Sequence, residues 1–450
     1  MTLTDICECP VTLPDATAVA HWNGVIHGLL SHGTQTPVHL GRLMDAVPEF
    51  AMGHAARGLF CLMTGRAEVL PAAHDALKAA RAAQAGQEIT AREAGWIDAL
   101  AHWLDGSPTA AIAAAEAVLR RWPSDTVTAK LSHGVRFMIG DSAGMRRSVE
   151  RVMDAHGPDH ACRGYLMGCH AFTLEETGDY ARAEAVGLEG LTHAHDDAWG
   201  LHAVAHVHDM TARPDEGIAL IEGNVDAWSG SNNFRYHVWW HKALLHMDRG
   251  EIDLALGLYD AQIRADKTDD YRDISNATSL LMRLELEGMD VGKRWEELAD
   301  FSENRVEDGC LVFADLHYLL ALTGAQRGDA QEAMAARFAR DAAKSGEMPA
   351  KVEDPGLAAL AGLNAFSEGR YDAAFSQLKA ARPAMPTIGG SHAQRDVFER
   401  MTIDAGLRAG RYDATEAILK DRVALRGGTY DRFAATRLDR LNRARAIPAQ

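Results

Sequence analysis

The stretch LEETGDYARAEA at residues 174–185 decides the fold, because three later stretches repeat its pattern. In each, a helix-forming run ends at a glycine, and alanine appears three to five residues later. Glycine ends helices because it has no side chain to oppose the left-handed backbone conformation. The pattern therefore predicts a helix, a tight turn and a second helix packed closely on the first. The later copies are HMDRGEIDLALG (246–257), FSEGRYDAAFS (366–376) and LRAGRYDATEA (407–417).

Similar turns recur along the chain at a spacing of about 34 to 41 residues. Helical hairpins repeated at this period are typical of tetratricopeptide-like repeats. Each hairpin buries its apolar face only against its neighbours, so we expect an all-α superhelical solenoid rather than the three domains that length alone suggests. Its predicted parts are an N-terminal capping region (1–47), the repeats (48–425) and a C-terminal cap (426–450). The turn markers are Gly65, Gly106, Gly140, Gly178, Arg213-Pro214, Gly250, Gly288, Gly328, Gly369 and Gly410.

Composition excludes several classes of protein. The 450 residues include 46 Lys and Arg against 63 Asp and Glu, a formal charge of −17, and 47% are hydrophobic. An acidic chain without a basic block predicts that nucleic acid and anionic membranes are not partners. No apolar run reaches the ~18–20 residues of a membrane helix, and the start MTLTDICECPVTLPD lacks the features of a secretory signal. We therefore expect a cytoplasmic protein.

The six cysteines are scattered, and only Cys7 and Cys9 are close in sequence. A single intervening residue is not the spacing of a zinc knuckle or of a redox motif. We expect reduced thiols that mostly fill the core.

In superhelices of this kind, the first helix of each hairpin generally lines the concave face. We therefore expect any functional site on those helices, which are predicted at 161–176, 200–212, 234–248, 272–286, 310–326 and 391–408.

Two consecutive first helices carry pairs of histidines. LHAVAHVHDM holds His202 and His206, and FRYHVWWHKALLH holds His237 and His241. Residues four apart share one face of a helix, which is the spacing that two imidazoles need to bind one metal ion. The sequence therefore predicts that all four imidazoles converge, either on a divalent metal ion or in a metal-free acid–base network. Asp209 lies on the same stripe as His202, as a ligand or a carboxylate that orients a ring.

Other polar side chains fall on further predicted inner helices. His170 precedes an acidic pair, and Asp315 and His317 interrupt the apolar run VFADLHYLLAL, where a charge requires a reason. We expect Asp315, His317 and Asp209 to act as catalytic residues and His170 to contact a ligand. A structural hydrogen bond between repeats is the alternative for Asp315 and His317.

The segment PTIGGSHAQRDVF opens a helix with Ser391 as the expected N-cap. Backbone N–H groups near Gly389-Gly390, together with His392 and Arg395, could hold a carboxylate or a phosphate. The alternative is an ordinary helix cap.

Five strings, in order along the chain, resemble the tetratricopeptide repeat protein 38 family. The resemblance covers almost the whole chain from VTLPDATAVAHWNG onward, and it implies a mostly helical repeat fold whose biochemical role is poorly defined. The family's recurring histidines map onto His202, His206, His237, His241, His317 and His392, whereas the family favours Glu at the position of Asp209. The strings are WGLHAVAHVHDM, NNFRYHVWWHKALLHMDRGEIDLALGLYD, SLLMRLELEGMDVGKRW, FADLHYLLAL and IGGSHAQRDVF.

Two functions fit this sequence. The first is a histidine-rich site that binds a small polar or anionic molecule, with metal-assisted hydrolysis favoured over chemistry at a redox metal. The second is a scaffold that binds a protein or peptide without catalysis, the usual role of open helical repeats. The sequence leaves open whether the protein is an enzyme.

Overall fold

The computed structural model describes residues 3–446, which form two compact units. Among the described residues, the first unit comprises 3–204 and 224–235, and the second comprises 205–223 and 236–446. Two of the three boundaries fall inside helices, in α11 (Ala198–Met210) and in α13 (Phe234–Asp248). The predicted C-terminal cap and N-terminal capping region extend beyond the described residues at 447–450 and 1–2, and their boundaries stay predictions.

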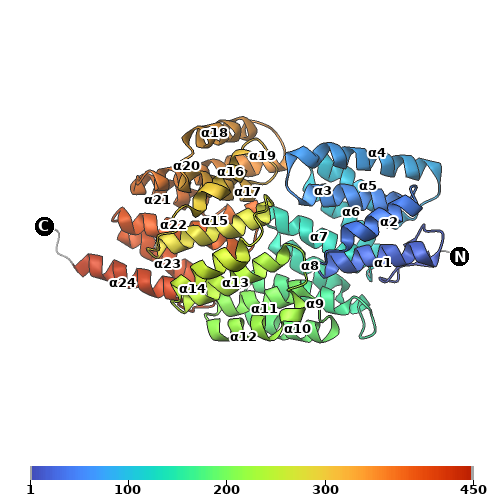
Figure 1. Cartoon of the computed structure of the whole chain (residues 1–450), viewed down its shortest axis with the longest axis horizontal. Helices are drawn as coiled ribbons and strands as arrows, with labels where there is room; N and C mark the ends of the chain where they lie inside the picture. Colours follow the sequence, from blue (N-terminus) through green and yellow to red (C-terminus); the bar gives the residue numbers. More distant parts are fainter. Residues whose placement is uncertain (1–2, 447–450) are drawn as a thin grey trace. The chain divides into compact units, whose positions relative to one another are not determined.

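The first unit is a succession of helical hairpins behind a short N-terminal strand pair (Figure 1). Consecutive helices such as α3 and α4, or α9 and α10, pack side by side. The elements are β1 (Leu3–Thr4), β2 (Pro10–Val11), α1 (Ala16–Leu30), α2 (Thr36–Ala46), α3 (Ala51–Met63), η1 (Ala67–Val69), α4 (Leu70–Gly86), α5 (Ala91–Leu104), α6 (Pro108–Arg121), α7 (Thr126–Ile139), α8 (Ser142–Val152), η2 (Met153–Ala155), α9 (Arg163–Glu176), α10 (Tyr180–His193) and η3 (Val225–Ala227).

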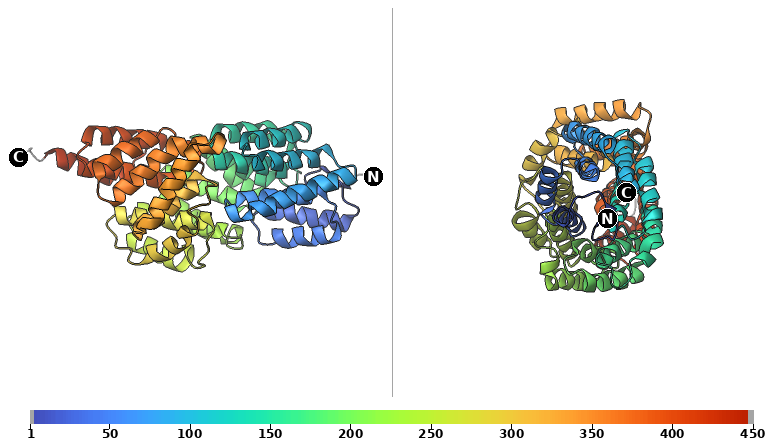
Figure 2. Two further views of the ribbon diagram at one scale, coloured as in Figure 1. Left: turned by 90° about the horizontal axis from the view of Figure 1, so that it is seen from above. Right: turned by 90° about the vertical axis from the view of Figure 1, so that its right-hand side faces the viewer.

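The second unit continues the same hairpin pattern, as the further views in Figure 2 show. The all-α repeat fold predicted from the turn spacing is confirmed. The elements are α12 (Pro214–Gly223), α14 (Ile252–Leu258), η4 (Tyr259–Ile263), α15 (Tyr271–Leu286), α16 (Arg294–Glu303), α17 (Val312–Gly324), α18 (Gly328–Ala342), α19 (Glu347–Lys351), η5 (Val352–Gly356), α20 (Leu357–Ser367), α21 (Tyr371–Ala381), η6 (Met385–Ile388), α22 (His392–Arg408), α23 (Tyr412–Leu425) and α24 (Arg432–Ala446).

Most of the predicted turn glycines adopt the left-handed conformation, as Gly178 does with φ of 82°. Two markers behave differently. Gly328 begins α18, and Gln326 takes the positive φ of 58° instead; likewise Ala212 (φ 50°) ends α11 before Pro214 begins α12. A non-glycine residue in this region costs on the order of 1–2 kcal/mol, which the packing of the adjoining helices must offset.

The first helices of the hairpins are the buried ones in the second unit. Every residue of α17 from Val312 to Thr323 is buried, whereas its partner α18 buries only Met334, Arg337 and Phe338. Helix α15 is almost as deeply buried and packs against both α17 and α22. Polar residues on these inner helices are therefore the ones that need a chemical explanation.

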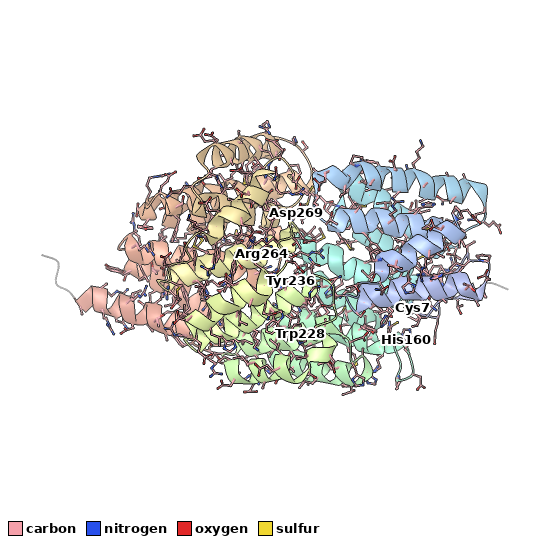
Figure 3. The ribbon with its side chains drawn as sticks, in the orientation of Figure 1. Cys7, His160, Trp228, Tyr236, Arg264 and Asp269 are labelled. Atoms are coloured by element: carbon pink, nitrogen blue, oxygen red, sulfur yellow. The ribbon has the colours of Figure 1, made fainter. Side chains whose placement is uncertain are left out.

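Ion pairs tie neighbouring helices together. Arg264 pairs with Glu297 of α16, and Arg305 pairs with Asp269 at 2.5 Å (Figure 3). In the first unit, the fully buried Arg92 joins Asp5 and Asp125, each at 2.6 Å, which anchors the N-terminal strands to α5 and α7.

The six cysteines are free thiols, four of them buried, as the sequence predicts. The sulfur atoms of Cys7 and Cys162 are 4.0 Å apart.

Within residues 3–446, no helix is both long and apolar enough to cross a bilayer.

Candidate functional site

Three of the four predicted metal-ligating histidines meet inside the second unit. His206 comes from α11, and His237 and His241 come from α13, the first helix of the next hairpin. His237 and His241 share a face because they are four residues apart. All three side chains are buried. We call this group the imidazole cluster.

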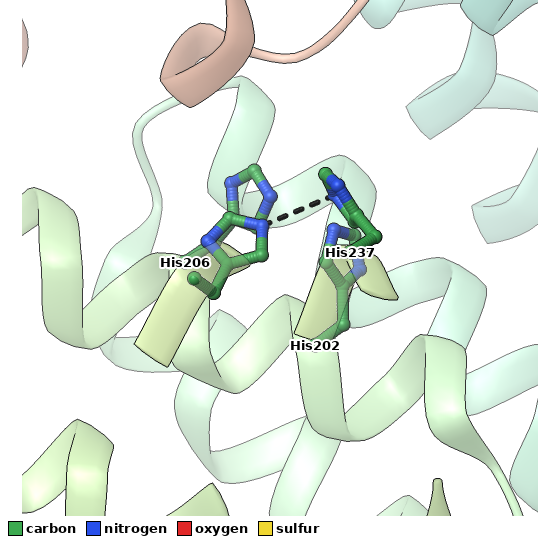
Figure 4. Close-up of side chains that lie close together, drawn as sticks. His202, His206 and His237 are labelled. Carbon is green, nitrogen blue, oxygen red and sulfur yellow. Dashed lines mark hydrogen bonds between the residues drawn. The ribbon is translucent and has the colours of Figure 1, made fainter. Parts of the chain in front are cut away.

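The three rings lie within reach of one another, and Figure 4 labels two of them, His206 and His237. The Nε2 atoms of His237 and His241 are 3.2 Å apart, and the ring centres of His206 and His241 are 4.3 Å apart. One nitrogen from each ring lies within 4.8 Å of the nitrogens of the others. The rings therefore face a common point rather than stacking on separate walls.

A hydrogen bond to helix α15 fixes the protonation of His237. Its Nδ1 lies 2.8 Å from Oδ1 of Asn276, a pure acceptor, so Nδ1 carries the proton and Nε2 presents a lone pair to His241. The indole of Trp240 stacks on the same ring at 5.2 Å. Burial lowers the pKa of His237 to about 3, although the bond to Asn276 opposes that shift. His237 is therefore neutral at pH 7, which is the form that binds metals.

The spacing of these nitrogens suits a transition metal. In a tetrahedral site with metal–nitrogen bonds of about 2.05 Å, two ligand nitrogens lie about 3.3 Å apart. The observed 3.2 Å between the Nε2 atoms of His237 and His241 fits that edge. Imidazole is a preferred ligand of zinc, copper, nickel and iron. The cluster could hold such an ion with little movement.

His202 lies one turn before His206 on α11, on the same helix face. Its ring is surrounded by aromatic side chains of the first unit, with Phe234 at 5.2 Å, Trp199 at 4.9 Å and Phe172 at 5.6 Å between ring centres. Its Nδ1 lies 3.3 Å from the carbonyl oxygen of Trp199. This arrangement leaves Nε2 as the ring atom able to join His206.

Asp209 has an arginine partner. Its carboxylate lies 3.2 Å from Arg426 at the end of α23, and Arg426 also donates to the Asp209 carbonyl. Three residues on a helix turn the side chain about 60° away from His206, so the two residues enter different surroundings.

Asp315 and His317 do not share a partner. Asp315 pairs with Arg337 of α18 at 2.8 Å, and burial raises the pKa of Asp315 to about 6. His317 donates from Nδ1 to the carbonyl of Phe313 at 2.7 Å and packs its ring against Phe398 of α22. Side chains two residues apart on a helix point about 160° apart, so Asp315 and His317 face different surroundings.

The Gly389-Gly390 turn serves as a helix cap. Ser391 and Gln394 form a reciprocal capping box at the start of α22, and Arg395 donates to the carbonyls of Gly389 and Gly390. The guanidinium thus stabilises the turn. His392 and Arg395 also line a cavity of about 340 Å³ together with Phe398.

His170 belongs to the first unit, where its Nε2 faces Glu150 at 3.5 Å. Burial lowers the pKa of His170, and Glu150 opposes that shift.

Sequence reasoning missed the polar face of α15. Asn276, Ser279 and Arg283 follow one another along helix α15 at intervals of three and four residues, and all three are buried. Asn276 bonds His237, the Ser279 hydroxyl accepts from Trp240 Nε1 at 3.1 Å, and Arg283 lies 5.4 Å from the centre of the Trp240 ring. Their helical spacing inside the string SNATSLLMRLEL was the available signal.

No protein-family model matches the chain. Among solved structures, the human IFIT1 dimer with PPP-AAAA is similar over 97% of this chain and 96% of that one, at 13% identity and a TM-score of 0.41. The human IFIT1 dimer with m7Gppp-AAAA gives 14% identity over the same shares and a TM-score of 0.43. Naa15/Naa10 bound to HypK gives 12% identity over 95% of this chain and 66% of that one, with a TM-score of 0.25.

The exclusion of nucleic acid as a partner, made from the acidic composition, is wrong. The two IFIT1 structures contain PPP-AAAA and m7Gppp-AAAA, which conflicts with that exclusion. The physical reason is that net charge averages over the whole surface and does not describe a local one.

Proposed function

We propose that this helical-repeat protein binds a divalent transition-metal ion through His206, His237 and His241. The observation that carries the proposal is the 3.2 Å approach of two imidazole Nε2 atoms, with a third ring beside them. In the absence of an ion, one of these nitrogens must donate a hydrogen bond to the other, so only one of the two presents a lone pair. A shared ion would engage all the lone pairs together.

Three protein ligands favour a catalytic ion over a structural one. Catalytic zinc sites generally keep three protein ligands and leave the fourth position to water, whereas structural sites use four. The ring of His202, which belongs to the first unit, packs between Trp199 and Phe234. We infer that the fourth position belongs to water, and that the ion activates it to hydrolyse a small polar or anionic molecule.

Asn276 acts as a positioning residue in this proposal. It accepts from Nδ1 of His237 and so keeps the Nε2 lone pair directed at the ion. Partners of this kind typically change metal affinity by about 10- to 100-fold.

The test is the metal content of the purified protein together with its affinity for Zn²⁺. We expect close to one equivalent for the wild type and a loss of at least about 100-fold in affinity for His237→Ala. The matched control is His246→Ala, which removes an imidazole from the same helix, where it pairs with Glu251 at 2.6 Å. Equal affinity in His237→Ala and His246→Ala would reject the site.

We further propose that the chain belongs to the tetratricopeptide repeat protein 38 family and acts in the cytoplasm. The ordered histidine-bearing strings support the first point, because their histidines lie on α11, α13, α17 and α22. No observation favours the scaffold function over the metal site.

A further inference from the structure

Arg283 of α15 is a buried cation without a counter-ion. Its side chain is 1% exposed, and among the described residues no carboxylate forms an ion pair with it, although Asp396 and Asp209 favour its charged form from farther away. The guanidinium donates to the carbonyls of Ser279 at 3.1 Å and Ala393 at 2.5 Å, while Nε has no partner. Burial lowers the pKa of Arg283 to about 9, and Arg400 adds to that shift, so the group is still charged at pH 7.

A second buried arginine, Arg437, has its charge balanced by carboxylates. Arg437 of α24 is fully buried and pairs with Asp404 at 3.0 Å and with Glu287. A buried charge that lacks such partners costs several kcal/mol. Evolution keeps such groups mainly where a ligand supplies the missing charge, so Arg283 marks a candidate anion subsite.

His317 offers a complementary acceptor near Arg283. Because its Nδ1 donates to the carbonyl of Phe313, the neutral ring presents Nε2 as an acceptor, and that buried atom has no partner. Both groups lie against helix α22, Arg283 at the carbonyl of Ala393 and His317 at the ring of Phe398. Burial lowers the pKa of His317 to about 4, and the charge of Arg283 contributes to that lowering.

This pair lies within a small molecule's length of the imidazole cluster. The guanidinium carbon of Arg283 is 5.4 Å from the centre of the Trp240 ring, and the His237 ring centre is 5.2 Å from the same point. The guanidinium carbon of Arg283 and the ring centre of His237 are therefore no more than about 10.6 Å apart.

An entry route borders the pair. Phe398, whose ring centre lies 5.1 Å from that of His317, also lines the cavity of about 340 Å³. His392, adjacent to the Ala393 carbonyl that Arg283 holds, lines the same cavity.

We propose that Arg283 and His317 bind the phosphoryl group of a small phosphorylated substrate, an inference that rests on the proposed function of the imidazole cluster. A phosphate supplies negative oxygens that match the fork of a guanidinium. A singly protonated phosphate also supplies the O–H donor that His317 Nε2 requires, whereas a carboxylate has no such donor.

The experiment is a calorimetric titration of the metal-loaded protein with inorganic phosphate and, separately, with acetate. We expect one phosphate site per chain, weaker binding of acetate, and a loss of at least about tenfold in phosphate affinity for Arg283→Met. Arg283→Lys keeps the charge without the fork and should fall between. Arg382→Met is the matched control, because Arg382 lines the same cavity but pairs with Glu399 at 2.9 Å.

Folding and metal binding are measured on the same preparations. Since Arg283→Met removes an unpaired buried charge, its melting temperature should equal or exceed that of the wild type. Absence of phosphate binding, equal binding by Arg283→Met, or equal affinity for acetate and phosphate would overturn the inference. His237→Ala separates the two proposals, because it should lose the metal and keep phosphate binding.

Discussion

Two groups of buried polar side chains begin on helix α11 of the second unit, and they differ in how their polarity is compensated. His206 enters the imidazole cluster with His237 and His241, where metal-binding ring nitrogens come together. Asp209, three residues later, belongs to a network of ion pairs. It pairs with Arg426, and Arg422 pairs with Asp431 at 2.7 Å. The network pairs each of these guanidiniums with a carboxylate, whereas the cluster brings together ring nitrogens within reach of one metal ion. We infer that the first holds the fold and the second serves a ligand.

Breaking the ion-pair network should have the largest effect on stability. In Asp431→Asn, the buried guanidiniums of Arg422 and Arg426 lose a carboxylate. Breaking a buried pair in this way costs about 3–5 kcal/mol. Urea denaturation followed by circular dichroism should show that loss, while Zn²⁺ affinity stays at the wild-type value. A variant as stable as the wild type would mean that the network is not what holds these helices together.

The same comparison predicts a pH dependence. Burial raises the pKa of Asp431, but Arg422 and Arg426 outweigh it and hold that pKa well below the ordinary 3.8. A group with a depressed folded pKa contributes stability above its unfolded pKa and loses that contribution as pH falls through the folded value. The stability difference between wild type and Asp431→Asn should therefore be constant from pH 5 to 7 and shrink below pH ~4. Denaturation series at fixed ionic strength measure it, and a difference that grows in acid would contradict the assignment.

Asn276→Leu should change the cluster without unfolding the chain. Removing the acceptor at 2.8 Å from His237 Nδ1 frees the ring to change tautomer. We expect a 10- to 100-fold loss of Zn²⁺ affinity. Competition with a chromogenic chelator measures it. Ser279→Ala, on the same face of α15, is the control, and an equal loss there would point to a general disturbance of the helix.

His202→Ala should have the smallest effect. If three imidazoles hold the ion, removal of the ring packed between Trp199 and Phe234 should lower Zn²⁺ affinity less than tenfold. A loss as large as that of His237→Ala would instead make the site a four-histidine, closed one. The chelator competition distinguishes the two outcomes.

The hairpins could be predicted from sequence because their signals are local. Gly178 and its counterparts end helices wherever they occur, and four-residue spacing places His237 beside His241 on any helix. The exception at Gly328 arose because the polar Gln326 could take the left-handed turn two residues earlier.

The roles of the charged residues could not be read in the same way. The partner of Asp209 is Arg426, which lies 217 residues away in the sequence, so no local sequence pattern predicts this ion pair. The sequence around Arg395 predicts an anion-binding residue, but in the structure its guanidinium donates to a carbonyl of its own turn, that of Gly389. Arg283, by contrast, is notable only because the folded chain gives it no carboxylate, which a sequence cannot show.

The most direct test of the metal site is an X-ray absorption spectrum of the zinc-loaded protein. We predict a first shell of nitrogen and oxygen at about 2.0–2.1 Å with the multiple-scattering signature of three imidazoles, reduced by one in His241→Ala. A first shell without imidazole scattering, or one unchanged in His241→Ala, would contradict the account.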